Sequence, residues 1–289
     1  MKTYKMFIDG KFPRTESGRH YTPRIKGTTL GNFCLASRKD LRNAVVAAKA
    51  AQSSWAGRTA YNRSQILYRL AEMLEGRRSQ LSDELEIQGA SGRQATIEVE
   101  RSIERVVHYA GWCDKYQQVF SSVNPVASPH FNFSGLEPTG IVFQAASENY
   151  PLLGLLSLAL PILVGGNTVI CLASQTRPIS AITLSECLAT ADFPAGVVNI
   201  LTGRLTELSD HVAGHREIQA IALDRSSTAQ KSSVQSIRET AADSLKRVHV
   251  YNLNWDREEN QNPYLIRDFC EVKTTWHPVE QIGSSGPSY

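Results

Sequence analysis

The sequence predicts an α/β fold built on a doubly wound, mostly parallel sheet that follows a helical region. Two observations carry this prediction. Between residues 141 and 251, five short apolar segments rich in Val, Ile and Leu alternate regularly with helical segments. Such alternation requires right-handed crossovers and helices on both faces of the sheet. The 289 residues, 42% hydrophobic and 20% charged, suffice for a full core.

The N-terminal part is predicted to be a short strand (4–8) with a turn at Asp9-Gly10, followed by three helices. Asp40 is expected to cap the first helix, whose apolar face is Leu41, Val45, Ala48 and Trp55. A second helix is expected from Asn62 onward, with Ile66, Leu70, Met73, Leu74, Leu81 and Leu85 facing inward. The third, over 96–118, is expected to bury Ile103, Val106, Val107 and Ala110.

Residues 119–137 change in character, with Ser, Asn, Pro and alternating apolar residues such as Phe131 and Phe133. This pattern favours an extended hairpin or arm. The alternating part follows, with predicted strands at 141–145, 169–172, 197–201, 218–223 and 248–251. The predicted helices between them are 151–164, 178–191, 205–212 and 227–242.

The C-terminal part is predicted to contain a polar loop and one more strand. Residues 252–264 read as a loop, and 269–276 alternate as in a strand with one wet side. Its other face would carry Cys270, Val272, Thr274 and Trp276. Residues 283–289 are rich in Gly, Ser and Pro, and are expected to be a disordered tail.

Charge and cysteine usage exclude several classes of function. The net charge is only +3, and 31 basic and 28 acidic side chains are mixed along the chain, which argues against a nucleic-acid surface. Five scattered cysteines and the absence of a signal-like N-terminus favour reduced thiols and a cytoplasmic location. The apolar run 151–164 would span roughly 21 Å as a helix, short of the roughly 30 Å of a bilayer core, so no membrane span is expected.

Four motifs resemble the aldehyde dehydrogenase family in order and spacing: 137–142 (EPTGIV), 148–152 (ENYPL), 165–169 (GGNTV) and 196–203 (GVVNILTG). The resemblance implies a cofactor-binding-like, Rossmann-like domain over 1–118 and 136–251. It also implies an oligomerisation arm and strand at 119–135 and 267–277. About 190 residues of the family's catalytic domain have no counterpart, and a loop over 252–266 would replace them.

The resemblance implies that the catalytic groups are missing. The family's nucleophilic cysteine lies in the segment without a counterpart, and none of the five cysteines lies in its motif. Tyr251 stands where the family has its general-base glutamate, and a neutral phenol is a poor base at pH 7. Asn149 matches the asparagine of the family's oxyanion hole. We interpret it as a cap of the helix that Pro151 begins, because an oxyanion donor without a nucleophile stabilises nothing.

The resemblance also implies a damaged cofactor crevice. Leu172 and Gln175 stand where the family has a lysine and a glutamate that hold the adenosine ribose. Asp224-Arg225 replace a small threonine-glycine pair near the pyrophosphate. Gly203 and Ser226 remain as weak remnants of cofactor binding. We therefore expect no bound cofactor. The alternative is NAD or NADP, which Arg225 would favour if it paired with a phosphate.

The most specific likeness is to the second, cysteine-lacking domain of family-16 aldehyde dehydrogenases, as in 272–278 (VKTTWHP). It implies a pseudoenzyme that scaffolds a homo-oligomer or docks on an active aldehyde dehydrogenase-type protein. Two alternatives stay open. One is a nucleotide-binding sensor that uses the sheet crevice, and the other is aldehyde oxidation that needs a catalytic partner.

Overall fold

A parallel five-stranded sheet forms the centre of the computed structural model, which describes residues 2–228 and 231–279. Its strands are β8 (Ile141–Ala145), β9 (Thr168–Leu172), β10 (Val198–Leu201), β11 (Ala220–Asp224) and β12 (Arg247–Tyr251). They are ordered β10-β9-β8-β11-β12, and all neighbours are parallel. This confirms the predicted doubly wound fold. The order reverses between β8 and β11, and ligands of such sheets bind where the carboxyl ends of the strands diverge.

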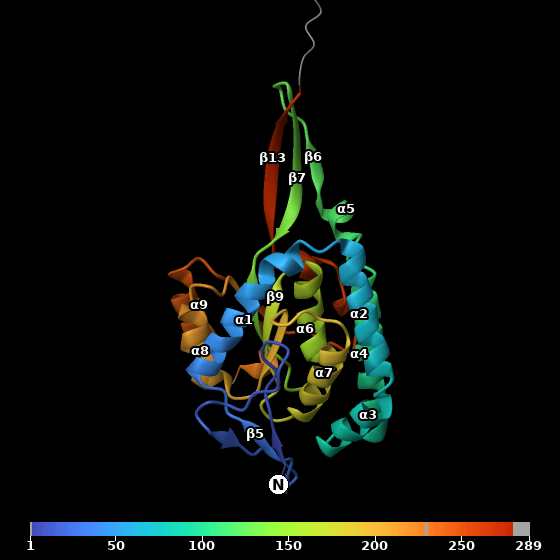
Figure 1. The fold of residues 1–289 in the computed structure, drawn as a ribbon, viewed down its shortest axis with the longest axis vertical. Coiled ribbons are helices and arrows are strands. Elements are labelled where there is room, and N and C mark those ends of the chain that lie inside the picture. The colour runs from blue at the N-terminus through green and yellow to red at the C-terminus, as the bar shows by residue number, and fades with distance from the viewer. Residues whose placement is uncertain (1, 229–230, 280–289) are drawn as a thin grey trace, which may run out of the picture.

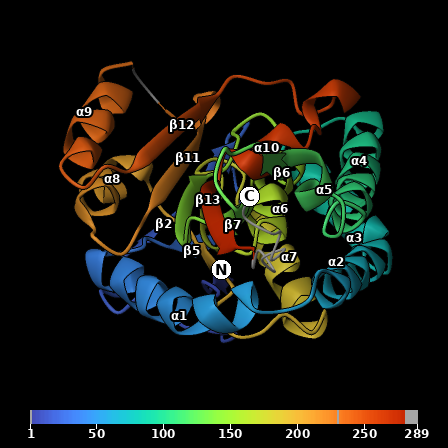
Figure 2. The same cartoon turned by 90° about the horizontal axis from the view of Figure 1, so that it is seen from above.

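Helices cover both faces of this sheet (Figure 2). One face carries α1 (Arg38–Ala56), α8 (Leu205–Gly214) and α9 (Lys231–Ala242), and the other carries α6 (Leu153–Val164) and α7 (Ile179–Thr190). Every residue of α6 is buried, because outer helices cover the side that faces away from the sheet. Within the described ranges no helix is both long and apolar enough to cross a bilayer.

The helical region differs from its prediction in three places. The predicted second helix is two helices, α2 (Ala60–Glu75) and α3 (Arg78–Ile87), because α2 ends at its C-cap Gly76. The predicted third helix is α4 (Gly92–Ala110) followed, after a turn, by the short α5 (Tyr116–Phe120). Val107, expected inside, is 44% exposed, whereas Val106 and Ala110 are buried.

The first helix is capped by Ser37, and Asp40 is not its N-cap. Asp40 lies three residues later and completes a capping box, since its carboxylate accepts the backbone N–H of Ser37 at 2.8 Å. The N-terminal strands are short: β1 (Thr3–Tyr4), β2 (His20–Tyr21), β3 (Arg24–Ile25), β4 (Thr28–Thr29) and β5 (Asn32–Cys34). The predicted strand over 4–8 is thus realised only at Tyr4, with isolated bridges at Phe7 and Ile8.

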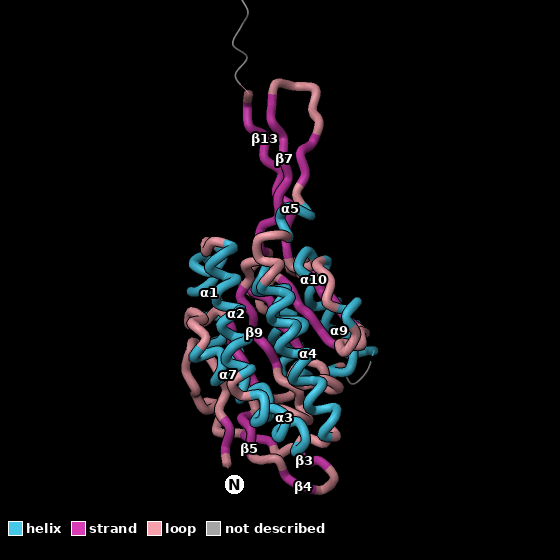
Figure 3. Tube along the Cα trace, turned by 90° about the vertical axis from the view of Figure 1, so that its right-hand side faces the viewer, coloured by secondary structure: helices cyan, strands magenta, loops and turns pink. Residues whose placement is uncertain are grey.

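A three-stranded antiparallel arm projects from the body (Figures 1 and 3). It consists of β6 (Ser122–Asn124), β7 (His130–Pro138) and β13 (Cys270–Pro278), in the order β13-β7-β6. All nine residues of β13 pair with β7, which confirms the predicted extended arm and C-terminal strand. At the base of the arm, the Asn167 amide donates to the carbonyl oxygens of Ile162 and Phe269, joining β13 to the body.

Between β12 and β13 the chain runs back across the body. We call residues 252–266 the strap. The strap was predicted to be a polar loop, but it contains a 3-10 turn (Glu258–Asn260) and the start of α10 (Tyr264–Arg267). Its Trp255 is fully buried. The predicted tail over 283–289 lies outside the described residues.

Candidate functional site

The carboxyl ends of β8 and β9 are joined by one carboxylate. Glu148, just after β8, accepts hydrogen bonds from Ser174 Oγ at 2.7 Å and from the backbone N–H of Gln175 at 2.6 Å and Thr176 at 3.1 Å. The cavity that remains there has a volume of about 20 Å³, and Leu172, Gln175 and Gly203 are among its lining residues. This volume holds about one water molecule. The two loops therefore close on each other rather than leaving an open crevice.

The end of β11 is occupied by internal hydrogen bonds. Asp224 is buried, and its Oδ1 accepts the backbone N–H of Ser226 at 2.8 Å as well as the Ser226 hydroxyl. The Ser226 oxygen in turn accepts the backbone N–H of Glu148 at 2.8 Å. The guanidinium of Arg225 donates a hydrogen bond to Thr228 Oγ1 at 2.8 Å. The structure thus brings Asp224, Ser226 and Glu148 together at the switch point between β8 and β11.

Trp255 of the strap lies over this switch point. Its indole N–H donates to Asp224 Oδ2 at 2.6 Å, and its ring packs with Leu153, Leu158 and Leu265. Gly154, in the first turn of α6, leaves room for the ring, since a Cβ there would lie 3.3 Å from Trp255 Cδ1 and 2.5 Å from Ser147 Cβ. Sequence reasoning missed Trp255 because its partners lie far away in the chain.

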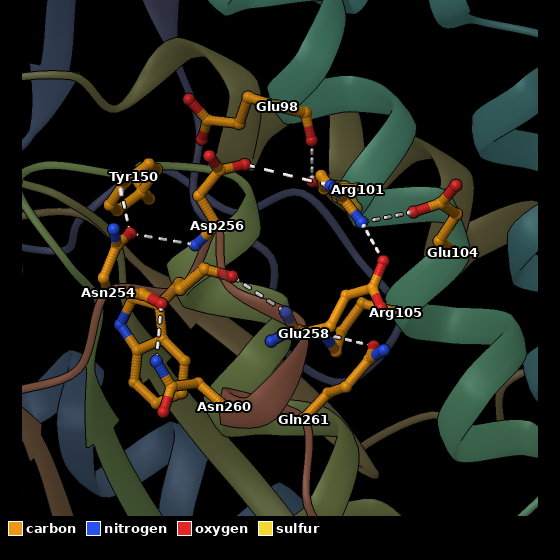
Figure 4. A network of polar contacts seen from close by, with 12 residues as sticks. Glu98, Arg101, Glu104, Arg105, Tyr150, Asn254, Asp256, Glu258, Asn260 and Gln261 are labelled. Atoms are coloured by element: carbon orange, nitrogen blue, oxygen red, sulfur yellow. Dashed lines mark hydrogen bonds and ion pairs between the residues drawn. The ribbon is translucent and has the colours of Figure 1, made fainter.

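The strap is held to α4 by a polar network (Figure 4). The buried Arg105 donates to the Trp255 carbonyl oxygen at 2.8 Å, to Gln261 Oε1 at 3.1 Å and to Ser157 Oγ at 2.5 Å. At the rim, Arg101 forms an ion pair with Glu258 at 2.9 Å. A buried guanidinium with three partners satisfies its donors and fixes the strap in place.

Tyr251 cannot act as a base in this arrangement. Its hydroxyl donates to Asp268 Oδ2 at 2.8 Å, and its ring lies parallel to that of His249. Burial, and then the neighbouring Asp268 carboxylate, raise the pKa of Tyr251 well above its usual value. A phenol that donates to a carboxylate stays protonated.

Asn149 does not cap the helix that follows it, so the capping interpretation is wrong. Glu98 Oε1 takes that task, accepting the backbone N–H groups of Leu152 and Leu153 at 2.9 and 3.1 Å. The Ser147 hydroxyl accepts the preceding N–H groups, including that of Asn149 itself. Within the described part of the chain the Asn149 side chain forms no hydrogen bond, and it faces a cavity beside α4.

All five cysteines are free and buried. Burial raises the pKa of Cys113, Cys171 and Cys270 to about 12 and that of Cys187 to about 11. The pKa of Cys34 is also raised by burial. Because a nucleophilic cysteine needs a lowered pKa and access to its substrate, none of these thiols is an activated nucleophile.

Comparison with known proteins assigns the family. The sequence model of the family described as "Aldehyde dehydrogenase family" matches residues 13–251. The chain belongs to the aldehyde dehydrogenase family. Among curated relatives, a putative aldehyde dehydrogenase (DhaS) of Bacillus subtilis is 32% identical over 252 residues, covering 85% of this chain and 50% of the relative. Mitochondrial 10-formyltetrahydrofolate dehydrogenase of Mus musculus is 30% identical over 278 residues, covering 93% of this chain and 29% of that protein.

Solved aldehyde dehydrogenase structures share the fold. The NAD⁺ complex of the Bacillus cereus enzyme superposes with a TM-score of 0.80 at 26% identity, covering 86% of this chain and 50% of that one. This chain therefore spans about half of an aldehyde dehydrogenase of that kind. Between β12 and β13 it has only the strap and the few residues after it, so the family's catalytic half has no counterpart there.

The arm of this aldehyde dehydrogenase homologue exposes apolar side chains. Val272 and Trp276 on β13 are 66% and 57% exposed, so the face predicted to be dry is open to solvent in the single chain. Thr274, on the same face, forms a hydrogen bond with Ser134 Oγ at 2.8 Å. Cys270 differs from its three predicted companions, because it is buried in the core at the base of the arm.

The opposite face of the arm carries a second apolar group that sequence reasoning did not single out as an interface. Phe131, Phe133 and Val123 are 47%, 38% and 67% exposed. They lie around an open apolar groove of about 540 Å³. The alternation of His130 to Ser134 contained this signal, since the two phenylalanines share one side of a strand.

Proposed function

We propose that this chain is a non-catalytic member of the aldehyde dehydrogenase family that acts as an assembly module. In this proposal the arm docks on a second copy of the chain or on an active aldehyde dehydrogenase-type protein. The proposal includes the finer kinship with the second domain of family-16 proteins. It also includes a cytoplasmic location, for which five free thiols are the supporting observation.

The exposed arm is the observation that carries the proposal. Exposed Val272 and Trp276 lie on β13, which forms one edge of the arm sheet among the described strands, with β6 at the other edge. An edge strand with exposed apolar side chains pairs readily with another chain. The same molecule has buried thiols of raised pKa and a switch point covered by Trp255. The exposed arm therefore supports a docking role better than these residues support a catalytic one.

The residues at the switch point do not fit the dinucleotide that the family binds. The cavity beside Leu172 and Gln175 has room for about one water molecule. Asp224 places a carboxylate at the carboxyl end of β11, where a pyrophosphate would meet like charge. NAD or NADP therefore has no role in the proposed function.

Light scattering coupled to size exclusion tests the proposal. We expect a mass of at least two chains, either for the protein alone or when it is mixed with a catalytic aldehyde dehydrogenase from the same source. Val272→Lys would reduce that mass, since a buried unpaired lysine opposes docking. Ile87→Lys is the matched control, because Ile87 is 59% exposed at the end of α3, and α3 lies at the end of the body opposite the arm (Figure 3). A strict monomer under both conditions would refute the proposal.

One observation favours a nucleotide-binding sensor as a second candidate. A groove of about 350 Å³ lies between α8 and α9, and Leu205, Ser209 and Ser236 are among its lining residues. It is large enough for part of a nucleotide. Millimolar NAD, NADP, ATP or ADP-ribose would then raise the melting temperature. No shift and no calorimetric heat with any of the four would remove this candidate.

Aldehyde oxidation in the presence of a catalytic partner is tested in the same preparations. The pure chain is expected to form no NADH from NAD and an aldehyde. If it did, and a single cysteine substitution abolished the activity, the interpretation of the thiols as inert would be wrong.

A further inference from the structure

A cavity of about 470 Å³ lies between the start of α4, the loops after β8 and β9, and the strap. This volume is within the range of small-molecule sites, about 300–1,000 Å³. Charged and polar side chains from all four segments converge on it: Glu98, Asn149, Tyr150, Arg177 and Asp256. The assembly proposed above uses none of these residues.

One part of the wall offers hydrogen-bond donors. Arg177 is half-buried in the loop after β9, and its backbone N–H donates to Ser174 Oγ at 3.0 Å. In residues 2–228 and 231–279 its guanidinium forms neither a salt bridge nor a hydrogen bond, although two carboxylates line the same cavity. The Asn149 amide, from the loop after β8, is likewise free of hydrogen bonds to the described residues. A guanidinium and an amide together suit a carboxylate.

The wall also offers two carboxylates. Glu98 is buried in α4, and only its Oε1 is used, by the N–H groups of Leu152 and Leu153. Burial raises the pKa of Glu98 to about 7. Asp256 comes from the strap, and its Oδ1 lies 4.0 Å from Nε of Arg101. Asp256 is near enough to Glu98 for its charge to contribute to the raised pKa of Glu98.

Because both signs of charge line one cavity, a ligand with a single charge would meet a like charge somewhere on the wall. A dipolar ligand meets complementary groups on both sides. We propose that this cavity binds a small amino acid, with the ligand carboxylate on Arg177 and Asn149 and its ammonium group on Asp256 and Glu98. The strap that replaces the catalytic half of the family thereby contributes one wall of a new binding site.

Titration calorimetry on the full chain tests this proposal with four five-carbon probes. Norvaline and 5-aminovalerate carry both charges, whereas valerate carries only the carboxylate and pentylamine only the ammonium. We expect at least one amino acid to bind at least tenfold more tightly than both single-charge probes. The proposal is overturned if neither amino acid binds at about 10 mM, or if valerate or pentylamine binds as tightly.

Two variants locate the site. Arg177→Met keeps much of the side-chain length and removes the charge, and we expect at least a tenfold loss of affinity for the amino acid. Arg42→Met, on the exposed side of α1, is the matched control and should bind as the wild type does. Thermal unfolding of both variants verifies that they are folded. Unchanged affinity in folded Arg177→Met would overturn the assignment.

Discussion

Removing the Trp255 side chain is expected to destabilise the whole body, although this residue lies in a segment that joins two strands. Trp255 is fully buried and packs in a cluster with Leu153, Leu158 and Leu265. Replacing a buried tryptophan by alanine costs about 3–5 kcal/mol. The substitution also removes the donor that Asp224 Oδ2 accepts at 2.6 Å, and a buried acceptor left without a partner costs about 1–3 kcal/mol.

These magnitudes are large against the total stability of a domain, about 5–15 kcal/mol. Trp255→Ala should therefore lower the urea midpoint strongly, or prevent folding at 37 °C. Trp255→Phe keeps an aromatic ring, but it removes the indole N–H and leaves a small cavity. A smaller loss than for alanine is expected, of which the unpaired acceptor accounts for about 1–3 kcal/mol. The graded pair keeps the test informative even if the alanine variant does not fold.

Urea unfolding followed by circular dichroism measures both variants, and Trp276→Ala on the exposed arm is the control. It should change the unfolding free energy by less than about 0.5 kcal/mol in the monomer. If Trp255→Ala lost less than about 1 kcal/mol, the strap would not be an integral part of the body. The account of a covered switch point would then fail.

The remaining predictions concern pH, the thiols and the arm. The folded-state pKa of Glu98, about 7, lies above its unfolded value of 4.5, so its contribution to stability is full below pH 4.5 and is lost as pH rises through 7. Glu98→Gln should therefore flatten the fall in urea midpoint that the wild type shows between pH 5 and pH 8. An equal slope in both proteins would contradict the raised pKa. A thiol reagent at pH 7.4 should label the native chain slowly and label all five cysteines in denaturant, because buried neutral thiols do not attack. Rapid labelling of even one native thiol would show an activated cysteine. Phe133→Ser should weaken assembly if the second arm face is covered, and leave it unchanged if only the β13 edge docks.

The alternation of strands and helices made the sheet predictable, because strands buried on both faces read as short apolar runs between helices. The strands β8 to β11 follow this pattern, whereas the edge strand β12 is half-buried and mixes apolar with polar residues. The ends of α2 and α4 also had a local sequence signal, since Gly76 and Gly111 are their C-cap residues. The prediction ran each helix past its glycine because the apolar periodicity continues on both sides.

The site was less predictable, because its contacts join residues far apart in the chain. The N–H groups at the start of α6 are satisfied by Glu98, 54 residues before Leu152, so local spacing suggested Asn149 instead. Trp255 finds Asp224 and Gly154 only after the sheet has formed. Composition alone made residues 252–264 look like a solvated loop, and nothing local distinguishes a buried tryptophan from an exposed one.

Hydrogen exchange along β13 tests the central claim of assembly through the arm most directly. The backbone amides of Cys270–Pro278 that β7 does not engage should exchange quickly in the dilute monomer. On assembly, at high concentration or with an added aldehyde dehydrogenase-type partner, their exchange should slow at least tenfold, since a docked strand would pair with them. Unchanged exchange along β13, with new protection on another surface of the assembled protein, would contradict the account.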